Sequence, residues 1–217
     1  EKDPTADIEG HDACRKICII SSLVFGKHVY PDSVFTKGIS DIQLCDVSSA
    51  DMLGYSIKLI ATVSKTSNGK ILPVVMPMLV PSENIIAGVS DVFNAVLVYG
   101  DGIDKTMFYG RGAGKLPTAS AVLGDIIESV KHDVTVFSQT WESSQDDSFI
   151  DDIDNFTARW YFRTPSENVL STGIGDTYDV HEDGSEYAFV TNDALTFKQA
   201  KNMAEQMKAL AVMPVLD

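Results

Sequence analysis

The chain lacks several features that would place it in particular classes of protein. Its 217 residues contain no apolar run long enough to span a bilayer, and no basic, apolar start that resembles a signal peptide. Basic residues are few, because 17 Lys and Arg stand against 31 Asp and Glu, which gives a net charge of −14. We therefore expect neither a nucleic-acid partner nor a membrane partner, since both favour a basic face.

Cysteine is scarce, with only three residues: Cys14, Cys18 and Cys45. An odd number of cysteines that do not cluster with histidine argues against a disulfide framework and against a metal site. Cys14 and Cys18 are four apart in a mostly apolar stretch, so we expect them to pack in the core. This usage fits a reducing cytoplasm and predicts no bound metal.

The glycines do not form a recognisable nucleotide-binding fingerprint. Gly110, Gly112 and Gly114 lie between an expected strand and a helix that starts near Pro117, an order that suits an anion. The dinucleotide spacing fails at Lys115, and Leu116 stands where a phosphate-binding P-loop needs Ser or Thr. Taken alone, this stretch favours a tight structural turn over an anion site.

The most informative stretch is the first sixteen residues. Pro4 disfavours helical geometry for Asp3, so the chain should begin as an acidic loop. Apolar spacing then predicts a helix from Asp12 that stops at Gly26.

Asp12 and Lys16 share a face of this expected helix, because they are four residues apart. The pair has two interpretations. One is an ordinary exposed ion pair. The other is a lysine positioned for proton transfer and oriented by Asp12, with Glu1 and Asp7 free to hold a cationic group.

The following hundred residues read as an α+β layer. Alternation from Tyr55 predicts a half-buried strand, and Asn68-Gly69 predicts a two-residue hairpin turn. The return strand contains prolines, which place it at a sheet edge or make it irregular. We also expect a capping box at Ser48-x-x-Asp51. Further elements are a helix over 82–92, a hairpin over 94–109 and a helix over 118–130. The fold class is therefore α+β, with a mixed or antiparallel sheet and helices on one face.

A second unit is expected after an acidic connector. Residues 138–154 are rich in Asp, Glu, Ser and Gln, which is typical of a solvated linker. Beyond them come a strand, a hairpin across Asp183-Gly184, a helix with the capping box Thr196-x-x-Gln199, and a last strand. We therefore predict a first domain over 1–137, the linker over 138–154, and a small α/β module over 155–217.

A known family carries the same motifs. The run Glu1-x-Asp3-Pro4-Thr5-Ala6-Asp7-x-x-Gly10-x-Asp12-Ala13-x-x-Lys16 resembles the signature of homoserine dehydrogenase, and Gly38-Ile39, Asp46 and 110–114 look like its later landmarks. The resemblance implies that Lys16 is catalytic and that Glu1, Asp7, Asp12 and Lys16 line the site for L-homoserine or L-aspartate 4-semialdehyde. It also implies that Gly110, Gly112 and Gly114 contact the nicotinamide end of NAD or NADP. Since an ordinary lysine is protonated at neutral pH, a role as base needs partial desolvation by the helix packing.

The resemblance also sets expectations for the whole protein. This chain is expected to be the C-terminal part of the enzyme, inactive alone, because the nucleotide-binding domain that holds most of the cofactor is absent. Residues 155–217 resemble a ferredoxin-like ACT module, which implies an amino-acid effector, although the usual glycine is missing from the segment 163–170. A homodimer or homotetramer in threonine, methionine and isoleucine biosynthesis is implied. The alternative is a non-catalytic dimerisation or amino-acid-binding module.

Overall fold

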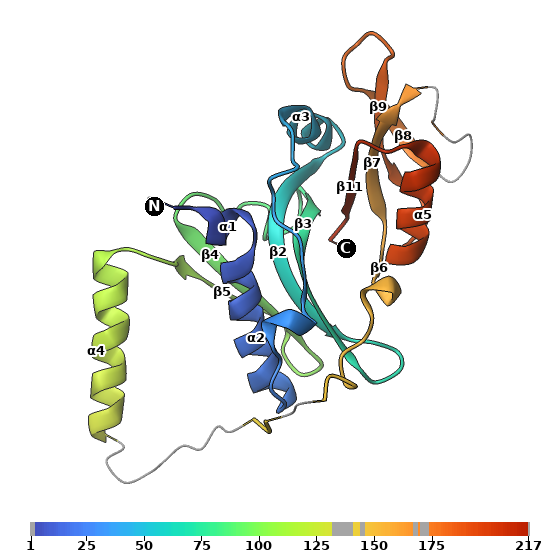
Figure 1. The fold of residues 1–217 in the computed structure, drawn as a ribbon. Helices are drawn as coiled ribbons and strands as arrows, with labels where there is room; N and C mark the ends of the chain where they lie inside the picture. Colours follow the sequence, from blue (N-terminus) through green and yellow to red (C-terminus); the bar gives the residue numbers. More distant parts are fainter. Residues whose placement is uncertain (1–2, 132–140, 144–145, 167–168, 170–173, 217) are drawn as a thin grey trace. The chain divides into compact units, whose positions relative to one another are not determined.

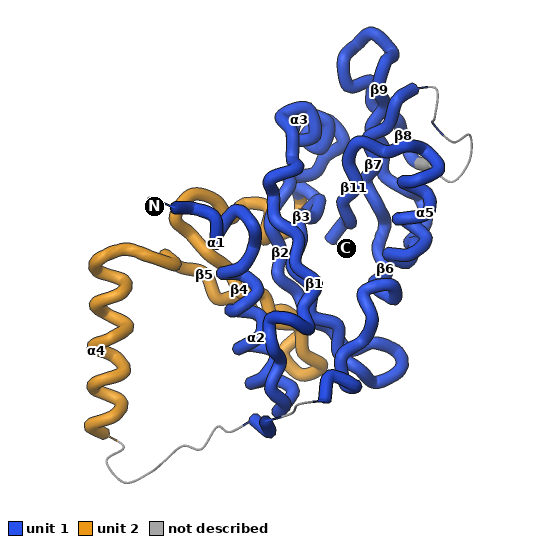
Figure 2. Tube along the Cα trace, viewed as in Figure 1, with its two compact units in different colours: residues 1–82, 140–217 blue, residues 83–139 orange. Residues whose placement is uncertain are grey.

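The computed structural model describes residues 3–131, 141–143, 146–166, 169 and 174–216. The chain forms two compact units, and unit 1 combines Glu1–Ser82 with Thr140–Asp217 (Figure 2). Unit 2 is Glu83–Gln139. Among the described residues, no helix has both the length and the apolar character that a membrane crossing requires.

The N-terminal half of unit 1 builds a three-stranded sheet with helices around it. Its strands lie in the order β1-β3-β2, with β1 parallel to β3. The strands β2 and β3 are antiparallel (Figure 1). The predicted position of the turn is confirmed, with a φ of 80° at Gly69. Its predicted length of two residues is wrong, because residues 66–70 connect β2 and β3. The elements are α1 (Thr5–Ile8), α2 (His11–Phe25), η1 (Pro31–Ser33), β1 (Phe35–Thr36), α3 (Leu44–Met52), β2 (Tyr55–Lys65) and β3 (Ile71–Pro81).

Both faces of β3 are buried. Ile71 and Val75 pack on one face against the apolar side of α2. Leu72, Val74 and Met76 pack on the other face with Ile153, Phe156 and Leu216 of the C-terminal half. Of the two predicted alternatives, the edge position was wrong, because β3 is the central strand of its sheet.

The C-terminal half of unit 1 builds a second sheet in the order β11-β7-β9-β8, with all neighbours antiparallel. Counted along the chain this order is 4-1-3-2, which is the order of the ferredoxin-like fold. Of the connection between β7 and β8, only residues 166 and 169 are described. The elements are η2 (Ile153–Asn155), β6 (Thr157–Ala158), β7 (Trp160–Pro165), β8 (Ile174–Asp179), β9 (Glu186–Thr191), β10 (Leu195–Thr196), α5 (Phe197–Met207) and β11 (Ala211–Pro214).

The two faces of this second sheet are covered by different parts of the chain. Trp160, Phe162 and Phe189 pack against α5, whose predicted capping box is confirmed: Thr196 Oγ1 accepts from the Gln199 N–H at 3.2 Å. The opposite face packs against α3 and against Leu79 of β3. The C-terminal sheet therefore shares a core with the first half of the chain.

The helix α3 begins earlier than predicted. Gln43 precedes its first turn and donates its N–H to Asp46 Oδ2 at 3.0 Å. Ser48 lies inside the helix and donates its hydroxyl to the Leu44 carbonyl at 3.2 Å. The capping box predicted at Ser48 is therefore wrong, because the cap lies five residues upstream.

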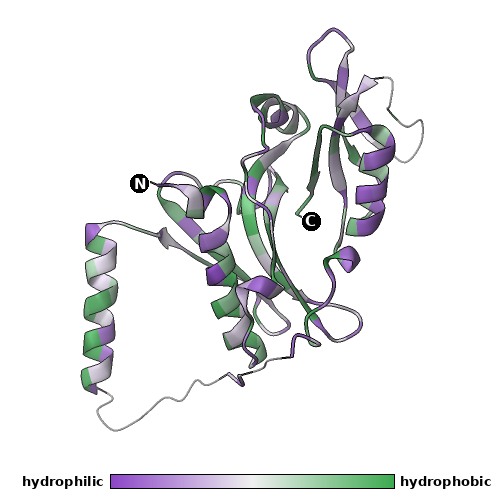
Figure 3. Ribbon diagram, viewed as in Figure 1, coloured by the Kyte–Doolittle hydropathy of each residue, from purple (hydrophilic) through white to green (hydrophobic). Residues whose placement is uncertain are grey.

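Unit 2 contains the hairpin of β4 (Phe93–Gly100) and β5 (Asp104–Arg111), followed by α4 (Lys115–Lys131). The hairpin was predicted correctly. The predicted helix over 82–92 was wrong, because this segment forms successive turns in which the Asn84 carbonyl accepts from the Ala87 N–H and its side chain accepts from the Ile86 N–H. Apolar residues recur along α4 (Figure 3), and none of its described side chains is buried.

Candidate functional site

The candidate site is the segment from Asp3 to Lys16, which the structure folds as two helices joined by a corner. Asp3 Oδ1 accepts hydrogen bonds from the Thr5 hydroxyl at 2.6 Å and the Thr5 N–H at 3.1 Å. These two bonds lower the pKa of the Asp3 carboxyl from its ordinary value. The Pro4 carbonyl then accepts from the N–H groups of Asp7 and Ile8, both at 3.0 Å. The sequence predicted a loop here, and the structure has the one-turn helix α1 instead.

The corner between α1 and α2 depends on Gly10. This buried glycine has a φ of 76°, a left-handed conformation that side chains rarely adopt. A Cβ at this position would lie 3.2 Å from Val75 Cγ1 and 3.3 Å from Thr36 Cγ2. The chain can therefore turn against β3 and start α2 at His11 only because no side chain is present.

The structure brings Asp12 and Lys16 together on the first turns of α2. Lys16 Nζ lies 2.6 Å from Asp12 Oδ2. The Lys16 side chain is 60% exposed and that of Asp12 is 43% exposed. The buried face of the helix consists of Cys14, Ile17, Cys18, Ser21 and Ser22. Packing among the described residues thus leaves Lys16 at the surface, and the desolvation expected from the helix packing is not provided by α2.

The other expected site residues are placed less completely. Asp7 is exposed on α1. Glu1 lies outside the described residues. The structure therefore unites two of the four proposed substrate-site residues directly, and a third lies on the adjoining helix.

The three glycines expected at the cofactor belong to unit 2, where they do different things. Gly110 lies within β5 and pairs with Asn94 of β4. The Gly112 N–H donates to the Val92 carbonyl at 3.2 Å, and a Cβ on Gly112 would collide with the Asn94 amide. Gly114 has a φ of 129° immediately before α4. The Gly112 N–H, one of the amides expected to be available to an anion, is therefore already hydrogen-bonded within unit 2.

The chemistry of the Asp12–Lys16 pair follows from its geometry. An ionised carboxylate only accepts hydrogen bonds, and an ammonium only donates them. Asp12 is in the first turn of α2, where the helix dipole favours negative charge. The Asp12 carboxylate, held on the first turn of α2, thus positions the Lys16 side chain, which can carry a proton, at the surface.

Sequence reasoning missed a buried charge cluster between α3 and β7. Arg163 Nε lies 2.8 Å from Asp46 Oδ1, and Arg163 Nη1 lies 2.7 Å from Glu186 Oε2. The Tyr161 hydroxyl also donates to Asp46 Oδ1, at 3.1 Å. An arginine inside the apolar run of β7 was the signal that could have found it, because a buried charge needs a partner. Its bonds join α3 to β7 and β9, so the cluster ties the second sheet to the first half of the chain.

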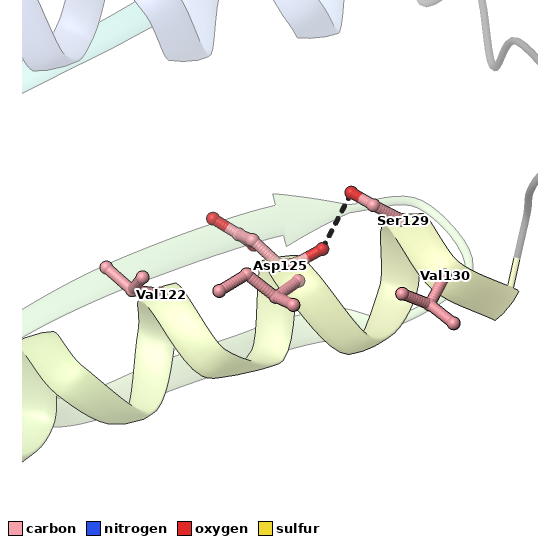
Figure 4. Close-up of a pocket in the computed structure, with 5 residues that line it drawn as sticks. Val122, Asp125, Ser129 and Val130 are labelled. Carbon is pink, nitrogen blue, oxygen red and sulfur yellow. Dashed lines mark hydrogen bonds between the residues drawn. The ribbon is translucent and has the colours of Figure 1, made fainter.

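Two hollows among the described residues lie away from the candidate site. One of about 560 Å³ lies along α4 and is lined by Val122, Asp125, Ile126, Ser129 and Val130 alone (Figure 4). The Ser129 hydroxyl there donates to the Asp125 carbonyl within the same helix. No polar groups from different elements converge in it, as a binding site would require. The described residues also contain no grouping of three or more His, Cys, Asp or Glu that could hold a metal ion.

The fold and the two N-terminal helices first define a class: an α+β protein that carries a lysine–carboxylate pair on the exposed face of α2 and has a ferredoxin-like sheet after it. A family model for homoserine dehydrogenase matches residues 1–127. Because that match covers more than half of the chain, this protein belongs to the homoserine dehydrogenase family.

Individual relatives agree with this assignment. The chain is 45% identical over 131 residues to the homoserine dehydrogenase of Pseudomonas aeruginosa, covering 60% of this chain and 30% of that protein. It is 41% identical over 165 residues to that of Corynebacterium glutamicum, covering 74% and 37%. The chain therefore spans about a third of the length of these curated relatives.

Solved structures extend the similarity to the C-terminal sheet. A homoserine dehydrogenase from Thiobacillus denitrificans superposes with a TM-score of 0.83 at 28% identity, covering 100% of this chain and 55% of that one. The homoserine dehydrogenase of S. aureus at pH 7.5 gives a TM-score of 0.77 at 30% identity, again covering 100% and 55%. The α+β class expected from the sequence is confirmed.

Proposed function

We propose that this chain supplies the substrate-binding part of a homoserine dehydrogenase, which interconverts L-homoserine and L-aspartate 4-semialdehyde with NAD or NADP. The observation that supports it is the Asp12–Lys16 pair, held at 2.6 Å inside the segment that matches the family. The alternative function, a non-catalytic dimerisation or amino-acid-binding module, draws on the ferredoxin-like sheet. It gives no role to the exposed pair on α2.

In the proposed reaction Lys16 moves a proton to or from the substrate oxygen. Asp12 orients the Lys16 side chain toward the substrate oxygen, while Asp7 and Glu1 accept hydrogen bonds from the substrate's ammonium. The cofactor supplies the hydride acceptor or donor when it is bound. Oxidation of the alcohol then balances: its carbon loses a hydride, its oxygen loses a proton, and an aldehyde forms.

We propose that the described residues do not by themselves bind a dinucleotide. The glycine stretch of unit 2 has the wrong spacing for a dinucleotide loop, and its Gly112 N–H is occupied by Val92. We propose that Gly110, Gly112 and Gly114 only touch the nicotinamide end of a cofactor bound mainly by another part of the enzyme. This chain alone is then inactive.

The remaining partners are also proposals. A homodimer or homotetramer and an amino-acid effector at the 155–217 module follow the family expectation. A cytoplasmic location agrees with the three free cysteines of this chain. None of these proposals depends on the role of Lys16.

The test is nicotinamide reduction on adding L-homoserine with NAD or NADP, run on this chain and on the longest upstream-extended gene product. In the longer product, Lys16→Ala should lower kcat by about 10²- to 10⁴-fold, the range of general acid–base catalysis. Lys37→Ala is the matched control, because Lys37 also forms an exposed i,i+4 pair, with Asp41 at 3.8 Å. Equal activity of the two variants, or no activity in the unmutated longer product, would shift the assignment to the binding module.

A further inference from the structure

The segment Lys37–Ile42, which follows β1, lies against the corner that joins α1 to α2. We call this segment the bracket. The Ile39 N–H donates to the Ile8 carbonyl at 2.9 Å. The Ser40 hydroxyl donates to Glu9 Oε1. At its other end the segment is fastened to the central strand, since the Lys37 N–H donates to the Val75 carbonyl at 2.8 Å. The bracket therefore ties the corner to β3 through hydrogen bonds.

The fit between the bracket and the corner is close. A Cβ on Gly38 would lie 2.6 Å from Glu9 Cα and would collide with the Ile8 carbonyl. Gly10 faces Val75 and Thr36 on the other side of the corner. Residues 8–10 are thus held between β3 and the bracket.

The helix α1 has little else to fix its direction. It is one turn long, with no buried residue among Thr5–Ile8. Short isolated helices are unstable in water, so the direction of α1 depends on the Gly10 corner together with the contacts at Ile8 and Glu9. Asp7 is on α1, whereas Asp12 and Lys16 are on α2.

We propose that Ser40 and Glu9 are positioning residues for the substrate: their hydrogen bond sets α1 against α2, and so sets Asp7 against the Asp12–Lys16 pair. Neither residue needs to touch the reacting atoms. The proposal rests on the proposed function, because it assigns Asp7 to the ammonium of the same substrate. It predicts that losing the bond weakens substrate binding more than it slows the chemical step.

The experiment uses the full upstream-extended enzyme and Ser40→Ala. The KM for L-homoserine should rise about tenfold, the size expected for losing a hydrogen bond to a charged group. We expect kcat to change less than about twofold and the KM for NAD or NADP to stay constant, because uniform binding is lost rather than transition-state binding. Ser40→Thr keeps the hydroxyl and should restore most of the affinity.

Two further variants separate positioning from general stability. Ser33→Ala removes another exposed Ser–carboxylate bond of unit 1, from Ser33 Oγ to Asp147 Oδ2 at 2.6 Å, and should leave the KM unchanged. Glu9→Ala should raise the KM like Ser40→Ala, and the double variant should add little more, because both remove one interaction.

The outcomes separate this inference from the proposed function. An active parent enzyme in which Ser40→Ala leaves the homoserine KM unchanged overturns the positioning role alone. The positioning role is also overturned if Ser33→Ala raises the KM equally, or if Ser40→Thr rescues nothing. A parent enzyme that does not oxidise homoserine overturns the proposed function first, and the substrate-positioning role with it.

Discussion

Asp46 and Arg163 are the most deeply buried opposite charges among the described residues, at 0% and 3% side-chain exposure. Burial by itself would lower the pKa of Arg163, but its hydrogen bonds to Asp46 and Glu186 raise it above the ordinary value. Burial and the neighbouring Asp46 charge also raise the pKa of Tyr161. Each charge thus has its closest oppositely charged partner or a hydrogen-bond donor across the interface between α3 and the second sheet, and Arg163 is also paired with Glu186 of β9.

The first prediction concerns this pair. Asp46→Asn should reduce the free energy of unfolding by about 3–5 kcal/mol, because it leaves the Arg163 charge buried without its main partner. Asp41→Asn is the control: that carboxylate is 80% exposed, and its pair with Lys37 should contribute at most about 1 kcal/mol. Urea unfolding of the two variants measures the difference. Similar midpoints for both would show that Arg163 finds compensation elsewhere.

The second prediction concerns Cys18. Burial and the adjacent Cys14 raise the pKa of the Cys18 thiol to about 12, above an unfolded value of about 8.5. The associated stability is therefore complete below about pH 8.5 and is lost as the pH rises toward 12. In a Cys45→Ser variant at pH 9, iodoacetamide should label Cys18 slowly when native and quickly in denaturant. Equal rates in both states would contradict the assignment.

At the scale of elements, β3 shows how a strand accommodates proline. On the side of β3 that faces away from β2, backbone hydrogen bonds join Ile71 to Phe149, Val75 to Lys37 and Leu79 to Leu216. Pro73 and Pro77 have the same parity along the strand, so their missing N–H groups also lie on that side. The complete β2–β3 ladder is preserved, and β1 pairs only at Val74 and Val75, between the two prolines.

The third prediction tests the bracket as an element. Gly38→Ala should destabilise unit 1 by about 1–3 kcal/mol, the usual cost of overpacking a tight site. Gly124→Ala is the matched control on α4: its Cβ would meet nothing within 4 Å. That change should stabilise its helix by up to about 1 kcal/mol, since alanine favours helix. Thermal unfolding of both variants gives the sign of the stability change. An unchanged stability of Gly38→Ala would show that the corner can move to accept the added methyl group.

At the scale of the whole molecule, unit 1 is assembled from both ends of the chain. One core cluster joins Ala50 and Leu79 to Tyr161, Ala188 and Met213. The sequence placed a domain boundary within 138–154, and that division stays a prediction. The contacts divide the chain into different compact units. Backbone hydrogen bonds join Ile71 of β3 to Phe149 and Asp151, which lie inside the predicted linker.

The fourth prediction separates the two descriptions. A chain ending at Asp154 should lose cooperative unfolding, because Ala50 and Leu79, both at 0% exposure, lose their packing partners. Asp46 would also lose Arg163. Adding residues 155–217 as a separate peptide should restore a cooperative transition in urea. A sharp transition of the truncated chain alone would favour an independent module after residue 154.

Local chemistry made several elements predictable. The helix α2 lies between Gly10 and Gly26, both in left-handed conformation, and the hairpins and the Thr196–Gln199 box are set within a few residues. Local chemistry also explains why the helix predicted over 82–92 was wrong. Its spacing suited a helix, but bonds of the Asn84 side chain and carbonyl closed turns instead.

The sequence by itself determined the family, the Asp12–Lys16 pair and the α+β class, because these depend on motifs, i,i+4 spacing and alternation. Only the tertiary structure decided that β3 is central, that Asp46 meets Arg163, and that Ser40 meets Glu9. These contacts join residues far apart in sequence, so their partners are chosen by packing and by the need to compensate buried charge. Local patterns in a single sequence do not identify which distant residue will be the partner.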